Sequence, residues 1–276
     1  SISMTKPARD ATLPYRYRNN QTPSTNKMST PVKPARTGGK RTRTKNAKTA
    51  AGQADNITTP ETIRLHLPEP AMPDFCGKRV LDMGCRDGWH CRYAIEHGAI
   101  ACTGIDASEP HIRQALRHNA SFWTEYRCAP LENPGLKPQT CDIALCAYAL
   151  DEHPDPQTVL AHIHRSLIPG GTLVLCARHP LHTATGTPDT ATDNNDTSAA
   201  TLFARYFDES ERAPAKGKPA PCRHRTTATL VNSVITAGFT LTGLSEHAPV
   251  PAHTDDTQTP VPASPATLVI TAKRTA

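Results

Sequence analysis

The feature that most constrains the fold is a run of strand, glycine-bearing turn, helix and second strand in the first half of the chain. The first apolar run, Arg79–Gly84, ends in the turn. The spacing predicts a helix over Trp89–His97, closed by Gly98, and a second strand over Ile100–Asp106. Short strands joined by a helix run parallel in one sheet, so this unit predicts an α/β protein.

The same alternation continues to the end of the chain. A helix opening at Ser108 runs to about Asn119, another opens at Pro156, and a third covers Thr226–Ala237. The second of these has Leu167 on its apolar face and is broken at Pro169. The predicted strands are Arg79–Gly84, Ile100–Asp106, Tyr126–Ala129, Cys141–Tyr148, Thr172–Ala177, Phe239–Leu244 and Thr267–Thr271.

Charge divides the chain into a tail, residues 1–58, and a folded domain, residues 59–276. Residues 1–60 hold twelve Lys or Arg and two acids, and few aliphatic residues, so the tail is expected to be disordered. It can attach to nucleic acid through its basic run. A solvated tail, an organelle transit peptide and a cloning remnant are the open alternatives. Within the domain, the polar stretch over residues 183–220 predicts a flexible loop or insertion.

Cysteine usage and hydropathy narrow the class of protein further. The nine cysteines are scattered without a C-x-x-C pair, which favours a reducing, cytoplasmic environment and predicts no zinc or other metal site. No apolar run approaches the roughly 20 residues of a membrane helix. The sequence therefore predicts a soluble protein with no membrane partner.

Acidic and glycine residues gather where the first two strands end. The turn reads Asp82-Met-Gly-Cys-Arg-Asp-Gly88, and Asp106 closes the second strand. In an open α/β sheet, ligands bind outside the carboxyl ends of the strands. The pattern resembles the D-x-G-x-G-x-G fingerprint of class I S-adenosylmethionine-dependent methyltransferases. That resemblance implies a Rossmann-like, doubly wound, mixed seven-stranded sheet with the last strand antiparallel and helices on both faces. It also implies S-adenosyl-L-methionine as cofactor.

Downstream motifs extend the resemblance over about Val80–Lys273. Cys141-Asp-Ile-Ala-Leu145 and Leu167-Ile-Pro-Gly-Gly-Thr-Leu-Val-Leu175 are similar to the corresponding segments of small-molecule methyltransferases. Finer motifs resemble a bacterial, methyltransferase type 11-like subgroup. They are Gly88–Ala99, Arg178–Thr183, Tyr206–Glu209, His224–Thr226 and Ala237–Phe239. The resemblance implies methyl transfer to a small-molecule acceptor.

The resemblance also implies which residues touch the cofactor. Asp106 binds the ribose hydroxyls, and Asp82 contacts the cofactor's amino end or orders the turn. Glu132 lies near the adenine rim, or is instead a solvent-facing turn acid. The full implied set is Asp82, Gly84, Cys85, Gly88, Asp106, Ala107, Glu132 and Ala147.

Methyl transfer needs a base only where the acceptor carries a proton. The candidate catalytic bases follow predicted strands or turns: His179, His224 and Asp151. The alternative for each histidine is an ordinary polar loop residue. Tyr148 and Leu150 are expected to line the site, with a core role as the alternative for Tyr148. Arg225 also has two alternative roles: it pairs either with an acidic group of the substrate or with a carboxylate in a surface salt bridge.

Two positions depart from the family pattern. Arg86 occupies the middle glycine of the fingerprint, where its side chain must point away from the cofactor or obstruct it. Asp151 stands where the subgroup commonly has His. Both are compatible with neutral drift or with lost activity. The second hypothesis is therefore a catalytically impaired protein of this fold that binds RNA or a ribosome through its basic tail. An active RNA methyltransferase is disfavoured, because no N/D-P-P-Y/F motif is present.

Overall fold

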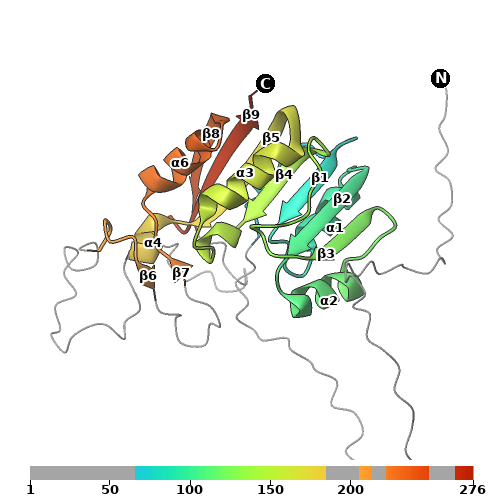
Figure 1. Cartoon of the computed structure of the whole chain (residues 1–276), viewed down its shortest axis with the longest axis horizontal. Coiled ribbons are helices and arrows are strands. Elements are labelled where there is room, and N and C mark those ends of the chain that lie inside the picture. Colours follow the sequence, from blue (N-terminus) through green and yellow to red (C-terminus); the bar gives the residue numbers. More distant parts are fainter. Residues whose placement is uncertain (1–65, 185–204, 213–221, 249–264, 276) are drawn as a thin grey trace, which may run out of the picture. The chain divides into compact units, whose positions relative to one another are not determined.

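The structure, a computed structural model, describes residues 66–184, 205–212, 222–248 and 265–275 (Figure 1). The predictions for residues 1–58 and for most of 183–220 lie outside these ranges. The central sheet has seven strands in the order β3-β2-β1-β4-β5-β9-β8. They are β1 Arg79–Met83, β2 Ala101–Asp106, β3 Thr124–Cys128, β4 Cys141–Ala147, β5 Leu167–Arg178, β8 Phe239–His247 and β9 Thr267–Arg274.

Strand direction confirms the predicted mixed sheet. β1 pairs in parallel with β2 and β4, and the parallel pairing extends to β3 and β5. The last strand, β9, pairs antiparallel with both β5 and β8. Two short strands that the sequence did not predict, β6 Glu211–Arg212 and β7 Cys222–Arg223, form a separate antiparallel pair.

The helices cover both faces of the sheet, as predicted. They are α1 Trp89–Glu96, α2 Glu109–His118, α3 Pro156–Ser166, α4 Pro180–Ala184 and α6 Thr227–Thr236, with 3₁₀ turns η1 Glu69–Ala71 and η2 Ala149–Asp151. Successive side chains of a strand point to opposite faces. Val80 therefore packs in the core with Ala94 and Ile112 of α1 and α2, whereas Leu81 packs in the core with Ile163 and Val234 of α3 and α6. Burying each large aliphatic side chain contributes about 1.5–3 kcal/mol.

The end of α3 differs from the prediction. The helix stops at Ser166, and Leu167 has extended dihedral angles and begins β5 opposite Cys141. Leu167 is fully buried, but in the sheet and not on a helix face. The cause lies two residues later, because Pro169 lacks an N–H group and disfavours helical conformation in the residue before it.

One edge of the sheet collects the predicted site. The carboxyl ends of β1, β2 and β4 meet there, and the strand order reverses between β1 and β4. Ligands of doubly wound sheets bind at such a reversal. Within the described residues no helix is long and apolar enough to cross a membrane.

Candidate functional site at the carboxyl edge of the sheet

The turn after β1 is tied to β2 by backbone hydrogen bonds. The N–H groups of Gly84 and Cys85 both donate to the Ile105 carbonyl, at 2.8 and 2.9 Å. Gly88 then caps α1 in the left-handed region, with φ +79°. A Cβ atom at Gly88 would lie 2.4 Å from the hydroxyl oxygen of Tyr126, so no other residue fits without movement. The turn is thus held rigidly beside the end of β2.

Gly84 allows a testable comparison with Gly77. Both have positive φ, +81° and +70°, but a Cβ at Gly84 would lie 2.4 Å from that of Ala149, whereas Gly77 faces open space. Left-handed strain costs about 1–2 kcal/mol and overpacking about 1–3 kcal/mol. We therefore expect Gly84→Ala to lower the free energy of unfolding in urea by about 2–5 kcal/mol, and Gly77→Ala by about 1–2 kcal/mol. Adding Ala149→Gly to Gly84→Ala should recover the overpacking part; equal losses in the two single variants would contradict the close approach.

The Asp106 carboxylate sits at the end of β2 and accepts three hydrogen bonds. Oδ2 accepts from the Arg86 N–H at 2.9 Å, and Oδ1 accepts from the Ser108 N–H at 2.8 Å. The Nδ1 atom of His111 lies 3.2 Å from Oδ1. Burial alone would raise the pKa of Asp106, but the hydrogen bonds from His111, Ser108 and Arg86 outweigh it and lower the pKa. The group is therefore a carboxylate at neutral pH.

The Asp82 carboxylate is completely buried and incompletely satisfied. Its Oδ1 atom has no hydrogen-bond partner among the described residues, while Oδ2 lies 3.6 Å from Cys91 Sγ and 3.7 Å from His90 Nδ1. Burial raises the pKa of Asp82 to about 7. An unpaired buried acceptor costs about 1–3 kcal/mol. A cationic donor placed against Oδ1 would remove that cost and favour the ionised form.

The other residues of the implied cofactor set occupy varied positions. Cys85 is buried within the turn, and Ala147 is buried at the end of β4. Ala107 is exposed beside Asp106. Glu132 is exposed, and its Oε2 atom lies 3.1 Å from His153 Nε2. A backbone hydrogen bond and, after it, the hydrogen bond with His153 lower the pKa of Glu132.

Asp151 lies buried in η2, directly after β4. Its Oδ2 atom accepts from the Arg178 N–H at 3.0 Å, and burial raises its pKa to about 7 despite the nearby guanidinium groups. One of these belongs to Arg225, which is itself buried and donates to the carbonyls of Leu150 and His153 on either side of Asp151. Of the two alternatives for Arg225, the surface salt bridge is therefore wrong, because the guanidinium is buried and instead fixes the backbone around η2.

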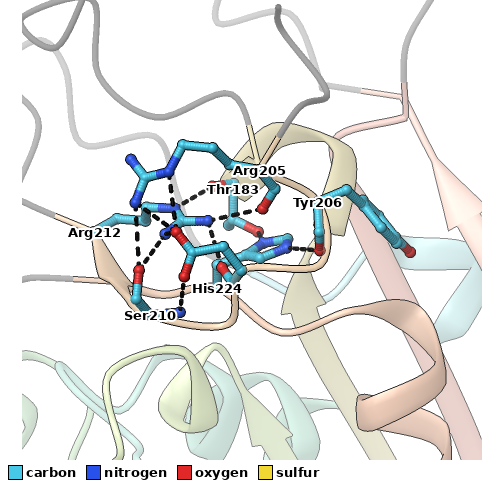
Figure 2. Close-up of polar contacts among 7 residues, drawn as sticks. Thr183, Arg205, Tyr206, Ser210, Arg212 and His224 are labelled. Carbon is cyan, nitrogen blue, oxygen red and sulfur yellow. Dashed lines mark hydrogen bonds and ion pairs between the residues drawn. The ribbon is translucent and has the colours of Figure 1, made fainter. Parts of the chain in front are cut away.

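The two histidines predicted as bases have no free ring nitrogen. His179 Nδ1 accepts from the Leu181 N–H at 3.2 Å, so Nε2 carries the proton toward Glu246 at 2.8 Å. His224 is fully buried, with Nε2 at 2.7 Å from the Tyr206 carbonyl and Nδ1 at 2.6 Å from the Thr183 hydroxyl (Figure 2). This geometry gives no support to a general-base role for either ring and favours structural roles.

Tyr148 and Leu150 are both buried in the core clusters. The Tyr148 hydroxyl lies 3.1 Å from the Thr267 hydroxyl at the start of β9. The core alternative for Tyr148 is therefore the one that the contacts favour.

Sequence reasoning missed a polar cluster centred on Arg212. This buried guanidinium donates to Thr183, Arg205, Asp208 and Ser210, including three backbone carbonyls (Figure 2). The cluster, hereafter the Arg212 cluster, joins Thr183, Arg205, Tyr206, Asp208, Ser210, Arg212 and His224. Three segments that lie far apart in the sequence, around Thr183, Arg212 and His224, thus meet in one hydrogen-bond network. Their spacing in the sequence did not predict these contacts.

Comparisons with known proteins match this fold and this turn. Residues 81–175 match a family described as a methyltransferase domain. The crystal structure of a proposed S-adenosylmethionine-dependent methyltransferase from Listeria monocytogenes is similar to this chain, with 31% sequence identity. It covers 75% of this chain and 95% of its own, with a TM-score of 0.63. The chain belongs to the class I S-adenosylmethionine-dependent methyltransferases.

Other relatives of this methyltransferase chain agree. An S-adenosylmethionine-dependent methyltransferase structure from Mesorhizobium loti is 29% identical, with a TM-score of 0.61, and covers 79% of this chain and 99% of its own. A ubiquinone biosynthesis O-methyltransferase from Coxiella burnetii is 36% identical over 99 residues, 35% of this chain and 42% of that protein. This chain therefore aligns with under half the length of that enzyme.

The cofactor of this methyltransferase family is S-adenosylmethionine. The residues at the carboxyl edge fit it chemically. Its ammonium group is the kind of donor that the unpaired Oδ1 of Asp82 lacks, and its ribose diol suits an ionised carboxylate such as Asp106.

Arg86, at the middle glycine position of this methyltransferase, has φ +50°. Its Nη2 atom pairs with Glu152 Oε1 at 2.9 Å, and both side chains are partly exposed. Exposed ion pairs contribute about 0–1 kcal/mol. We therefore expect Arg86→Gly to change the affinity for S-adenosylhomocysteine, measured by calorimetry, by less than about fivefold. Glu152→Gln, which breaks the pair from the other side, serves as the control. A gain of about tenfold or more in Arg86→Gly alone would mean that the guanidinium obstructs the cofactor.

Proposed function

We propose that this chain transfers the methyl group of S-adenosylmethionine to a small-molecule acceptor. The observation that carries the proposal is the pair of buried carboxylates beside the glycine turn. Asp106 is ionised at the end of β2, and Asp82 has an unpaired oxygen in β1. In this proposal Asp106 binds the ribose hydroxyls and Asp82 meets the cofactor's ammonium group. The backbone of Gly84, Cys85 and Gly88 borders the methionine part, while Ala107, Glu132 and Ala147 border the nucleoside.

The cofactor supplies an activated methyl group, because its sulfonium sulfur is a good leaving group. The chain's task is then to position the two reactants in line and, where the acceptor carries a proton, to remove it. The hydrogen bonds from Gly84 and Cys85 to Ile105 keep the turn fixed while this happens. Arg225 holds the backbone around η2 in the same way, through the carbonyls of Leu150 and His153.

Asp151 is the strongest candidate for the base. Its Oδ1 atom has no hydrogen-bond partner within the described ranges, whereas both ring nitrogens of His179 and of His224 are engaged. Burial brings its pKa to about 7, close to the pH at which a base works best in the cell. The departure from the subgroup pattern thus replaces one group that titrates near neutrality with another.

The name of one group of relatives bears on the acceptor. The Coxiella burnetii protein is a ubiquinone biosynthesis O-methyltransferase, which supports an oxygen acceptor on a small molecule. The hypothesis of a catalytically impaired RNA- or ribosome-binding protein gains no support from the relatives. The tail on which that hypothesis depends lies outside the described residues.

A labelling experiment tests the proposal. The protein is incubated with methyl-labelled S-adenosylmethionine and a cell extract, and the extract is then passed through a membrane that retains RNA and protein. After chromatography has separated unreacted S-adenosylmethionine from the filtrate, we expect a new labelled compound there that is absent with Asp106→Ala. Label confined to the retained RNA or protein would contradict a small-molecule acceptor.

A further inference from the structure

The Asp106 carboxylate has too few free acceptor positions for a ribose diol. A carboxylate offers about four lone-pair sites on its two oxygens. Oδ1 already faces the Ser108 N–H at 2.8 Å and His111 Nδ1 at 3.2 Å, and Oδ2 accepts from the Arg86 N–H at 2.9 Å. One position is left, but two ribose hydroxyls need two. One of the three present partners must give way when the cofactor binds.

His111 is the partner that can leave. The Arg86 and Ser108 groups are backbone N–H groups, fixed by the turn after β1 and by the start of α2. The His111 contact is made by a side chain in the first turn of α2, and 41% of that side chain is exposed. Rotation about its side-chain bonds releases Oδ1 without moving the backbone.

We propose that His111 is a positioning residue of the cofactor site, which holds the Asp106 carboxylate in the free protein and yields its place to the ribose. The inference rests on the proposed role of Asp106. It adds His111 to the residues of the cofactor site, and it couples cofactor binding to the release of a proton.

The charges around His111 determine the direction of its titration. The hydrogen bond to Asp106 raises its pKa, burial lowers it, Arg86 from the turn after β1 lowers it, and Glu152 from the end of η2 raises it. The net effect in the free protein is a raised pKa. Loss of the Asp106 bond on cofactor binding would remove the largest of these causes, so the pKa would fall and a protonated ring would release its proton.

This release makes cofactor affinity depend on pH. A group that loses its proton on binding weakens the affinity as pH falls through its pKa, by up to about tenfold per pH unit. Asp82, whose pKa burial raises to about 7, titrates in the same range. The difference between the wild type and His111→Gln therefore isolates the contribution of His111, because glutamine keeps a donor but does not titrate.

Histidine NMR tests the proposal directly. The ring Cε1–Hε1 signal of His111, assigned by its absence in His111→Gln, is titrated with acid in the presence and absence of saturating S-adenosylhomocysteine. This demethylated product of the cofactor lacks the sulfonium charge, so a shift reports the lost bond and not an added sulfonium cation. We expect the pKa of His111 to fall by about one unit or more when the ligand is bound. We also expect the ligand affinity of His111→Gln, measured by calorimetry, to depend less steeply on pH than that of the wild type.

His118→Gln, at the end of the same helix, is the matched control, and we expect it to retain the wild-type dependence. An unchanged or raised pKa of His111 in the complex would overturn the proposal while leaving the cofactor site intact. No binding of S-adenosylhomocysteine to the wild type would overturn the cofactor site and this inference with it.

Discussion

Asp106→Ala is expected to weaken the binding of S-adenosylhomocysteine by about 100-fold to 10,000-fold. The variant removes a carboxylate that would accept two hydrogen bonds from the ribose, and each bond to a charged group contributes about 1.5–3 kcal/mol. The sum, about 3–6 kcal/mol, corresponds to the stated range because 1.4 kcal/mol is tenfold in affinity. Calorimetric titration of the wild type and the variant measures the difference.

The control for this prediction is Glu109→Gln, which removes an exposed carboxylate at the start of α2, three residues after Asp106. We expect it to bind like the wild type. Asp106→Ala also deprives the Arg86 and Ser108 N–H groups of their acceptor, so titrations belong well below the variant's own melting temperature. Unchanged affinity in a folded Asp106→Ala protein would show that the ribose binds elsewhere.

Asp151→Asn is expected to slow methyl transfer by about 100-fold to 10,000-fold, the usual contribution of a general base. The affinity for S-adenosylhomocysteine should stay near the wild-type value, since Asp151 is not part of the proposed cofactor set. Burial raises the pKa of Asp151 to about 7, so the wild-type rate should rise with pH up to about 7 and then level off. The variant's rate should not follow this curve. Initial rates across pH measure both effects.

Stability and rate changes can be told apart in this variant. The pKa of Asp151 is raised in the folded protein above its value of about 3.9 in the unfolded chain, so its stabilising contribution is complete below about pH 4 and lost as pH rises through 7. Asparagine avoids that loss, and Asp151→Asn should not be less stable above pH 7. Asp74→Asn, an exposed carboxylate far along the chain from η2, is the control for activity. A wild-type rate in Asp151→Asn would mean that the base lies elsewhere or is not needed.

The sequence sufficed for the sheet because its signals are local. Asp82, Gly84 and Asp106 lie within one strand–helix–strand unit, and their spacing already requires the turn to face the end of β2. The position of each sheet strand in the sequence was predictable for the same reason, since each strand is one continuous apolar run. The end of α3 was not, because the preference of Leu167 for the sheet comes from its pairing with Cys141, 26 residues earlier.

The roles of the polar motif residues could not be predicted. His224 looked like a base in a turn, but its ring partners, Thr183 and Tyr206, lie 41 and 18 residues away in the sequence. Arg212 likewise gains its role from carbonyls that only the folded chain brings together. For Arg86, the sequence showed the departure from glycine, while its left-handed φ and its pairing with Glu152 required the structure.

The most direct measurement of the central claim is a calorimetric titration of the wild-type protein with S-adenosylmethionine. The account predicts one cofactor per chain, with a dissociation constant of roughly 1 μM to 1 mM, the range typical of enzyme substrates. It also predicts competition by S-adenosylhomocysteine for the same site. No binding heat with the cofactor at about 1 mM, in protein shown to be folded, would contradict it.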